Sequence, residues 1–461
     1  MAIPRPGHPV RSRCVRASAL ARGDAGVADA GPARALALAF VPAFACACVA
    51  ILFVVCGAVW SVSAGAGPEV RLNVIYMAQA GYQPDEFEEM TREFARESGI
   101  DVALNFVRYD EEYQKIVTSA TSPVATYDVV LVDLIWVAEF AEKGYVVPLD
   151  RGLAAKVRQG ISPEILSAFE HRGRIWAMPF LANFHFLFYN EDMLKRAGFD
   201  APPGTIEEME VQMRAMKRKG VVEYPMIASW NQKEGLVCEY VWLVGAYGGG
   251  IFDSGGDPIF NHGPGVAALE TMTRWVRDGL VNPLALTADE LVAKDVFIAG
   301  KAAFAPNWTF LSGFMSDPAV SRVASHARMG LLPVAQAVRD ETGRVSSSVS
   351  GFQGLAVMAN SSHKPEAWRY VEFMASPEVQ GRCLQEVPVW TSLQMSREAC
   401  AKDPWLDVKL EQMRWLRHRP KLVRYQEISA IMQRFIHAAL EGAMSPQEAL
   451  DVAVERIRSL P

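Results

Sequence analysis

Short continuous apolar runs alternate along residues 70–133 with segments whose apolar residues recur at helical spacing. This alternation predicts strands separated by helices. Short apolar runs of seven or eight residues are typical of buried strands. Between two of them, Phe87, Met90 and Phe94 share one helical face behind a proline and early acidic residues. Strand–helix–strand order at this spacing predicts a parallel sheet with right-handed crossovers. The expected strands are 71–77, 100–107 and 127–133, and the expected helices are 84–98 and 110–120.

A second set of elements begins after residue 180. The aromatic run "LANFHFLFY" (181–189) predicts one strand. The next helix is expected at 205–220, where Thr205 and Glu208 have the spacing of a capping box. The C-terminal region reads as mostly helical and ends in a serine-capped amphipathic helix at 445–457. No internal repeat interrupts this order.

The N-terminal 66 residues have a different composition from the rest. Six arginines precede the uncharged run Ala35–Trp60, which is long enough to cross a bilayer. The arginines lie only before this run, which predicts a cytoplasmic N-terminus and an extracytoplasmic remainder. The run is either a secretory signal cleaved after small residues such as Ala64 or Ala66, or a retained anchor. Lipid attachment is the third alternative, at Cys46, Cys48 or Cys56.

Charge and cysteine content narrow the possible partners of residues 67–461. The whole chain has a net charge of −6, and the N-terminal segment holds six of its basic residues but only two acidic ones. The remaining chain is therefore more acidic, and it has no basic cluster that could neutralise a nucleic acid. Its three cysteines are too few for a disulfide framework, although Cys383 and Cys400 could pair.

Motifs of enzyme chemistry are missing from the sequence. It contains no HExxH, GxSxG or GxxxxGK[ST] motif and no paired CxxC, and the eight histidines lack zinc-site spacing. Many carboxylates are present, but no pair has a spacing that indicates a glycosidase. We expect neither catalysis nor a cofactor or metal ion.

One stretch, Gly173–Met209, resembles the extracellular solute-binding proteins of ABC transporters, the family of maltose- and trehalose/maltose-binding proteins. It reads "GRIWAMP", "LFYNEDMLKRAGF" and "PPGTIEE", with Ile206 where the family usually has tryptophan. Five further segments resemble the family in the same order, among them "YDVVLVDLIWVAEF" and "FIAGKAAFAPNWTF". The resemblance covers most of residues 70–460. Within it, "KEGLVC" (233–238) is similar to the trehalose/maltose branch.

The resemblance implies an α/β fold, the two-lobe periplasmic binding protein fold (type II), with the ligand in a cleft between the lobes. In this fold neither lobe is continuous in sequence, and the strand in "FIAGKAAFAPNWTF" would re-enter lobe one. The expected division is 1–66 for the basic segment and signal or anchor, 69–179 and 303–364 for lobe one, and 180–302 and 365–461 for lobe two.

The resemblance also implies candidate ligand contacts on loops that follow strands. Aromatic faces suit the apolar surfaces of sugar rings, and carboxylates, amides and arginine suit hydroxyl groups. Trp230 and Trp390 are added by chemistry alone, and His185 shares a strand face with Asn183. The candidates carried over from the family are Gln79, Tyr82, Asp133, Trp136, Asn183, Trp308, Gln353 and Arg419.

Gln353 marks a departure from the family pattern. Many sugar-binding relatives have Gly-Gly-Trp where this chain reads "GFQG", so one stacking platform is absent. The expected function is a monomeric, periplasmic or membrane-anchored protein that binds a carbohydrate and delivers it to an ABC transporter permease. The alternatives are a ligand sensor that docks on a membrane receptor, and an enzyme built in the same cleft.

Overall fold

The computed structural model describes residues 70–78, 82, 84–383 and 386–460. These belong to one compact unit that begins at Val70. The expected signal or anchor and Gln79 lie outside the described residues, and so does the side chain of Cys383. Among the helices that are described, none combines the length and apolarity needed to span a membrane.

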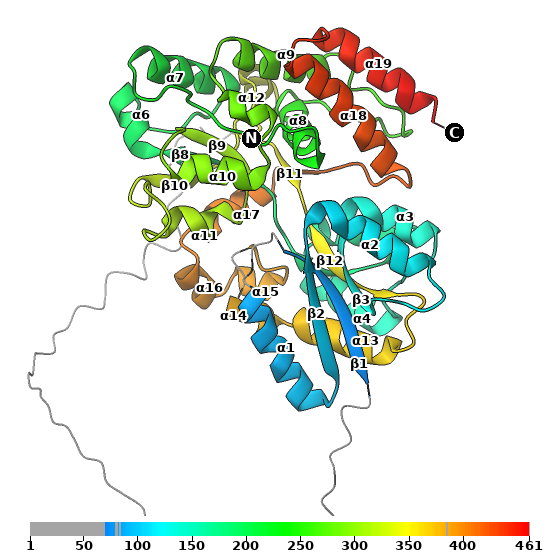
Figure 1. Cartoon of the computed structure of the whole chain (residues 1–461). Coiled ribbons are helices and arrows are strands. Elements are labelled where there is room, and N and C mark those ends of the chain that lie inside the picture. Colours follow the sequence, from blue (N-terminus) through cyan, green and yellow to red (C-terminus); the bar gives the residue numbers. More distant parts are fainter. Residues whose placement is uncertain (1–69, 79–81, 83, 384–385, 461) are drawn as a thin grey trace, which may run out of the picture. The chain divides into compact units, whose positions relative to one another are not determined.

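The first sheet has six strands in the order β2-β1-β3-β12-β4, with β7 also paired to β12. β1 is parallel to β2 and β3, as the alternating pattern predicts, whereas β12 runs antiparallel to β3, β4 and β7. We call this sheet and the helices that pack on it the first lobe (Figure 1). Its strands are β1 (Arg71–Met77), β2 (Asp101–Val107), β3 (Val129–Asp133), β4 (Val146–Val147), β7 (Met178–Leu181) and β12 (Gln353–Met358).

Helices cover the first sheet and close its core. α1 (Pro84–Ser98) packs against α13 (Lys364–Met374), and the Tyr370 hydroxyl lies 3.0 Å from Thr91 Oγ1 and 3.3 Å from the Tyr76 hydroxyl. α2 (Tyr109–Thr121) packs on β1. The other helices between β3 and β7 are α3 (Val137–Glu142), α4 (Arg151–Gly160) and α5 (Pro163–Phe169).

The second sheet has three antiparallel strands in the order β10-β8-β9. α10 and α11 pack on its strands, while α8, α9, α18 and α19 pack on one another, and we call the sheet and these helices the second lobe (Figure 1). Its strands are β8 (His185–Asn190), β9 (Phe304–Trp308) and β10 (Ala327–Gly330). Its principal helices are α6 (Glu191–Ala197), α7 (Ile206–Arg218), α8 (Glu234–Ala246), α9 (Pro264–Arg277), α10 (Glu290–Ile298), α18 (Tyr425–Leu440) and α19 (Pro446–Arg458).

Shorter elements connect these parts. Strand β11 pairs in parallel with β13, and β5 forms a small hairpin with β6. The short strands are β5 (Glu170–His171), β6 (Arg174–Ile175), β11 (Ser348–Ser350) and β13 (Leu416–His418). The short helices are α11 (Leu311–Ser316), α12 (Gln336–Thr342), α14 (Pro377–Cys383), α15 (Thr391–Gln394), α16 (Arg397–Lys402) and α17 (Leu406–Met413).

The topology corrects the expectation of one strand at 181–189. β7 ends at Leu181 in the first sheet and β8 begins at His185 in the second, so residues 182–184 cross between the lobes. Most residues of both strands are apolar, because nearly all of their side chains are buried, and the residues between them include no glycine or proline. The hydrophobic pattern therefore could not show where one strand ends.

Two other expectations about the lobes are wrong. β9 pairs with β8 from His185–Trp308 to Tyr189–Phe304, so it stays in the second sheet and does not re-enter the first. α13 packs on β12 and α1, which places it in the first lobe, not the second. The remaining limits of the lobes stay a prediction.

The N-terminus of α7 tests the predicted capping box. Thr205 Oγ1 accepts a hydrogen bond from the Glu208 amide at 3.1 Å, and Glu208 Oε2 accepts one from the Gly204 amide at 2.7 Å. We expect Thr205→Ala to lower the free energy of unfolding by about 1 kcal/mol, because one N-terminal amide loses its acceptor. Urea denaturation measures this, with Thr205→Ser as the control that keeps the hydroxyl. Equal losses in both variants would contradict the capping role.

Candidate functional site

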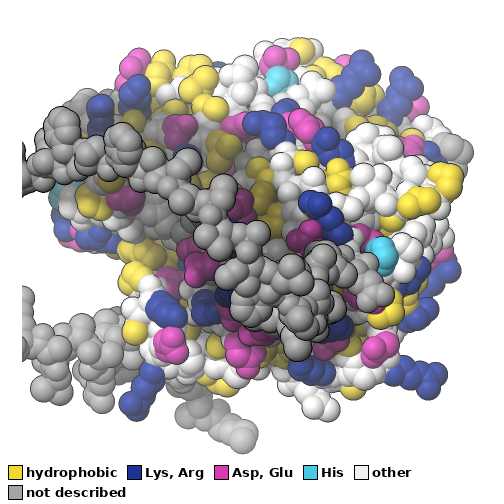
Figure 2. All heavy atoms as spheres, turned by 60° about the horizontal axis from the view of Figure 1, so that its bottom comes forward, with side chains coloured by type: hydrophobic (Ala, Val, Ile, Leu, Met, Phe, Trp, Pro, Cys, Tyr) yellow, Lys and Arg dark blue, Asp and Glu magenta, His cyan; other side chains and the backbone are white. Residues whose placement is uncertain are grey.

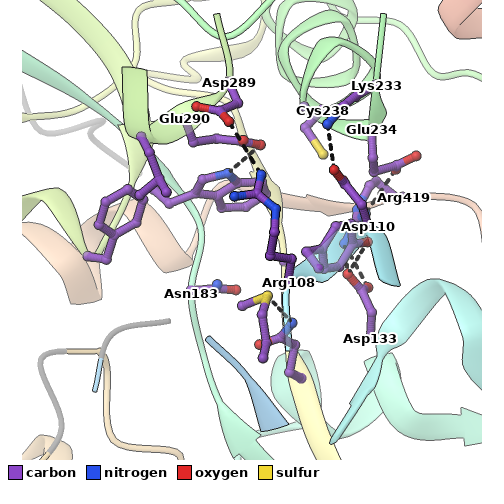
Figure 3. Close-up of a pocket in the computed structure, with 18 of the residues that line it drawn as sticks. Arg108, Asp110, Asp133, Asn183, Lys233, Glu234, Cys238, Asp289, Glu290 and Arg419 are labelled. Carbon is purple, nitrogen blue, oxygen red and sulfur yellow. Dashed lines mark hydrogen bonds and ion pairs between the residues drawn. The ribbon is translucent and has the colours of Figure 1, made fainter. Parts of the chain in front are cut away.

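A pocket opens between the two lobes and is lined from both of them (Figure 3). Its empty volume is about 850 Å³, which includes space open to solvent. The first lobe contributes the C-terminal ends of β1 and β3, the first residue of β12 and the start of α2. From the second come the starts of α8 and α10 and the end of β9. The described lining residues are Met77, Arg108, Tyr109, Asp110, Asp133, Asn183, Lys233, Glu234, Gly235, Cys238, Asp289, Glu290, Leu291, Trp308, Phe310, Gly351, Gln353, Glu386 and Arg419.

Arg419 is a buried cation that joins carboxylates of both lobes. Its guanidinium donates to Asp133 Oδ1 at 2.7 Å and Oδ2 at 2.9 Å, and to Glu234 Oε1 at 2.9 Å. Only 2% of its side chain is exposed. The Tyr109 hydroxyl also donates to Asp133 Oδ2, at 2.9 Å. With its charge satisfied twice by the protein, this arginine organises the pocket and is not free for an anionic ligand.

Two amide side chains come from segments that cross between the lobes. Asn183 precedes β8, and Gln353 is the first residue of β12. The backbone amide of Gly351 donates to the backbone carbonyl of Asn183 at 3.0 Å, so the two crossing segments lie side by side. Asn183 Oδ1 and Gln353 Oε1 are buried and have no hydrogen-bond partner among the described residues. Each is an acceptor that a ligand donor would satisfy.

Trp308 ends β9 and supplies an aromatic surface to the pocket. A Cβ at Gly351 would lie 2.6 Å from its ring, so the absence of a side chain at Gly351 makes room for the indole. On another side the ring contacts His185 edge to face, with centroids 4.0 Å apart. Burial, and secondarily the charge of Arg419, lowers the pKa of His185 to about 3, so this imidazole is neutral near pH 7. On this side the tryptophan therefore packs against an uncharged ring.

Glu290 faces the pocket beside Trp308. The Trp308 indole N–H lies 3.5 Å from Glu290 Oε1, at the limit of a hydrogen bond. A Cβ at Gly235 would lie 2.6 Å from the same oxygen, so the missing side chain lets Glu290 approach the first turn of α8. Burial raises the pKa of Glu290, and the charges of Asp289 and Asp110 act in the same direction.

Ion pairs lie between the lobes among the more exposed lining residues. Lys233 at the start of α8 contacts Asp110 at the start of α2, and both side chains are nearly half exposed. Arg108 lies 3.9 Å from Asp289, the residue that caps α10. In Figure 3 the Lys233–Asp110 pair lies above Arg419 and Asp133, and the Arg108–Asp289 pair lies to their left. Exposed pairs of this kind contribute about 0–1 kcal/mol, so they can exchange partners readily.

Five of the predicted contacts come together at this pocket: Asp133, Asn183, Trp308, Gln353 and Arg419. Gln79 lies outside the described residues. The four other candidates do not line the pocket, because their rings are buried among protein side chains and backbone. Tyr82 stacks on Phe87, Trp136 on Tyr109, and Trp390 donates to the Ala375 carbonyl at 2.7 Å, while Trp230 is 1% exposed. His185 also lies behind the lining, under Trp308.

Several pocket residues were missed by sequence reasoning. Glu234 and Cys238 belong to "KEGLVC", a segment that resembles one sugar-binding branch, so a signal for Glu234 existed. Arg108 and Asp110 follow β2, the one strand of the first three after which no ligand contact is expected from the resemblance. Glu290 had no such signal, because it belongs to a helix start that only the tertiary fold brings to Trp308.

The described residues hold no cluster of three or more histidine, cysteine, aspartate or glutamate side chains suited to a metal ion. Polar side chains elsewhere on the visible face are mixed in sign, with basic and acidic groups interspersed (Figure 2). What the pocket offers chemically is an aromatic surface, unsatisfied acceptors and several carboxylates. That set suits reversible binding of a small polar molecule.

Comparison with known proteins agrees with this geometry. The sequence profile described as "Bacterial extracellular solute-binding protein" matches residues 80–381, more than half of the chain. A mannitol-binding protein of Pseudomonas aeruginosa is 25% identical over 390 residues, which cover 77% of this chain and 86% of that protein.

Solved structures share the fold. A maltose-bound MalE3 of T. maritima superposes with a TM-score of 0.78 at 21% identity and covers 84% of this chain and 99% of its own. An ABC transporter solute-binding protein of Agrobacterium radiobacter in complex with ribitol gives 0.75 at 23% identity, with coverages of 85% and 98%. The expected two-lobe fold is confirmed.

Removal of the Arg419 charge tests its structural role. We expect Arg419→Gln to lower the free energy of unfolding by about 3–5 kcal/mol, because Asp133 and Glu234 would remain buried without their cation. Urea denaturation measures the loss. The control is Arg414→Gln, whose 72% exposed side chain pairs with Glu411 and should contribute about 0–1 kcal/mol. A loss at Arg419 no larger than the control's would contradict this role.

The raised pKa of Glu239 leads us to expect that the stability of the protein depends on pH. Burial raises its pKa from 4.5 to about 8, although its Oε2 accepts a hydrogen bond from the Trp242 indole at 2.6 Å. Between these pH values the folded protein keeps a proton that the unfolded chain has lost, so the free energy of unfolding falls as pH rises. We expect Glu239→Gln to remove up to about 5 kcal/mol of this fall.

Urea denaturation of both proteins at several pH values from 4.5 to 9 checks this expectation. The measured quantity is the difference in slope, which cancels the contributions of other groups. Parallel curves for the variant and the unmodified protein would show that Glu239 ionises at its ordinary pKa.

Proposed function

Because the chain belongs to the bacterial extracellular solute-binding protein family, we propose that it is the solute-binding component of an ABC importer and carries a carbohydrate to a membrane permease. It acts outside the cytoplasm as a monomer, and it needs no chemistry on the ligand. The observation that carries the proposal is a pocket between two lobes with an aromatic surface at Trp308 and unsatisfied acceptors at Asn183 and Gln353.

Sugar and polyol ligands match these groups. The apolar face of a pyranose ring, or the carbon chain of a polyol, packs on the Trp308 indole. Their hydroxyl groups donate to Asn183 Oδ1 and Gln353 Oε1, whose desolvation is otherwise uncompensated. The relatives that bind mannitol, maltose and ribitol support this class of ligand.

Delivery requires that the ligand favour one arrangement of the lobes. A molecule that contacts Trp308 in the second lobe and Asp133 or Gln353 in the first binds the closed arrangement better than an open one. The difference between these affinities, and not the total number of contacts, sets how far binding drives closure. The exposed interlobe ion pairs cost little to form or break, which suits such a motion.

Titration calorimetry of the full chain in mild detergent tests the proposal. The panel is trehalose, maltose, sucrose, glucose and mannitol, and we expect micromolar or tighter binding of at least one. Trp308→Ala should weaken that binding at least about 10-fold, because it removes the stacking surface. The matched control is Trp176→Ala, whose half-buried ring lies outside the pocket. Equal effects of both substitutions would contradict a role for this pocket.

A further inference from the structure

The described pocket lining carries more negative than positive charge. Carboxylates outnumber basic side chains by six to three; the acids are Asp110, Asp133, Glu234, Asp289, Glu290 and Glu386, and the bases are Arg108, Lys233 and Arg419. All three bases are already engaged by carboxylates, Arg419 by two of them. An anionic ligand would therefore have to displace a carboxylate, whereas a cation would meet an excess of them.

Glu290 is a pocket carboxylate without a basic partner. It forms no ion pair within 4 Å with the described residues, and the Trp308 indole nitrogen lies 3.5 Å from its Oε1. The geometry nevertheless holds it in place, between the indole and the first turn of α8 at Gly235. Its raised pKa agrees with a buried carboxyl group that no cation yet stabilises.

The other unsatisfied atoms in the lining have the same polarity. Gln353 Oε1, Asn183 Oδ1 and both carboxylate oxygens of Glu386 are buried acceptors that have no hydrogen-bond partner among the described residues. The unpaired groups of the lining are therefore hydrogen-bond acceptors, which a ligand with hydrogen-bond donors would satisfy. Hydroxyl groups would satisfy the two amides, but a carboxylate in a partly desolvated site gains more from a charged donor.

We propose that the preferred ligand is a polyhydroxylated amine, an amino sugar or amino polyol, whose ammonium group binds at Glu290 beside Trp308 while its hydroxyls donate to Asn183 and Gln353. This inference rests on the proposed function and narrows its ligand class. The carboxylate supplies the charge-assisted hydrogen bond, and the indole face packs on the carbon skeleton of the ligand. Sugar phosphates and sugar acids are excluded by the same charge distribution.

The test is titration calorimetry of the full chain at pH 7 with matched ligand pairs. The pairs are glucose and glucosamine, sorbitol and 1-amino-1-deoxysorbitol, and trehalose and trehalosamine. We expect at least one amine to bind about 10- to 100-fold more tightly than its hydroxyl partner. N-acetylglucosamine keeps the nitrogen but not its charge, and it should not share the gain. Glucose 6-phosphate should not bind.

Glu290→Gln then assigns the preference to this side chain. It keeps the shape but removes the charge, so the amine should lose at least about 10-fold more affinity than its neutral partner. Glu270→Gln, an exposed residue of α9, is the control for charge removal and should leave the preference intact.

The outcomes separate the two proposals. Neutral members that bind as tightly as the amines, or an N-acetyl derivative as tight as glucosamine, would overturn the amine inference and leave the sugar-binding function standing. No binding by any member would count against both. Should Glu290→Gln fail to fold, the ligand pairs and the N-acetyl derivative still decide the matter on the unmodified protein.

Discussion

The ion pairs of Arg419 with Asp133 and Glu234 tie together three segments that are far apart in the sequence. Asp133 ends β3 in the first lobe, Glu234 begins α8 in the second, and Arg419 directly follows β13. A buried guanidinium is tolerated only when carboxylates surround it, and each carboxylate likewise needs the cation. The three backbones must therefore meet at one place. That place is the floor of the pocket.

The buried ion pairs at the floor of the pocket cost more free energy to separate than the exposed ion pairs at its opening, which we call the mouth. Any movement that separated Asp133 from Glu234 would leave Arg419 short of a partner in a desolvated site, which is costly. The pairs Lys233–Asp110 and Arg108–Asp289 lie in exposed positions and cost little to separate. The lobes can thus open at the mouth while the crossing segments at Asn183 and Gly351 keep their contact. A ligand bound to both lobes shifts such an equilibrium by its differential affinity.

Much of the fold could be predicted from local pattern, because the first three strands and their helices repeat one simple period. The failures have a physical origin. Residues 178–190 are mostly apolar and contain no glycine or turn-forming cluster, so nothing in the pattern separates β7 from β8, although they belong to different sheets. β9 was placed in the wrong lobe for a similar reason, since strand pairing is a tertiary property. Resemblance alone indicated the two-lobe arrangement, and the matching structures confirm it.

The site was predictable where a side chain ends a strand of the sheet, as Asp133 does, or begins one at a crossing, as Gln353 does. Both occupy paired positions on β3 and β12, so the sheet register places them together. Tryptophan positions were less predictable. Trp136 and Trp230 are each 1% exposed, because large aromatic side chains stabilise cores as readily as they bind ligands. Glu290 could not be found from the sequence, since its role depends on the distance between α10 and β9.

Gln353 stands where the resemblance leads one to expect tryptophan, and we propose that this exchange changes which ligands the pocket binds. A tryptophan at this position would offer a second apolar face, whereas the buried glutamine offers an acceptor that is unsatisfied among the described residues. Leaving such an atom without a donor costs about 1–3 kcal/mol, and Asn183 Oδ1 adds a similar penalty. A ligand rich in donors recovers this energy, while one rich in acceptors does not. The unsatisfied acceptors and the carboxylate of Glu290 therefore both favour ligands that are rich in hydrogen-bond donors. The selectivity that we propose arises from these unpaired groups of the protein.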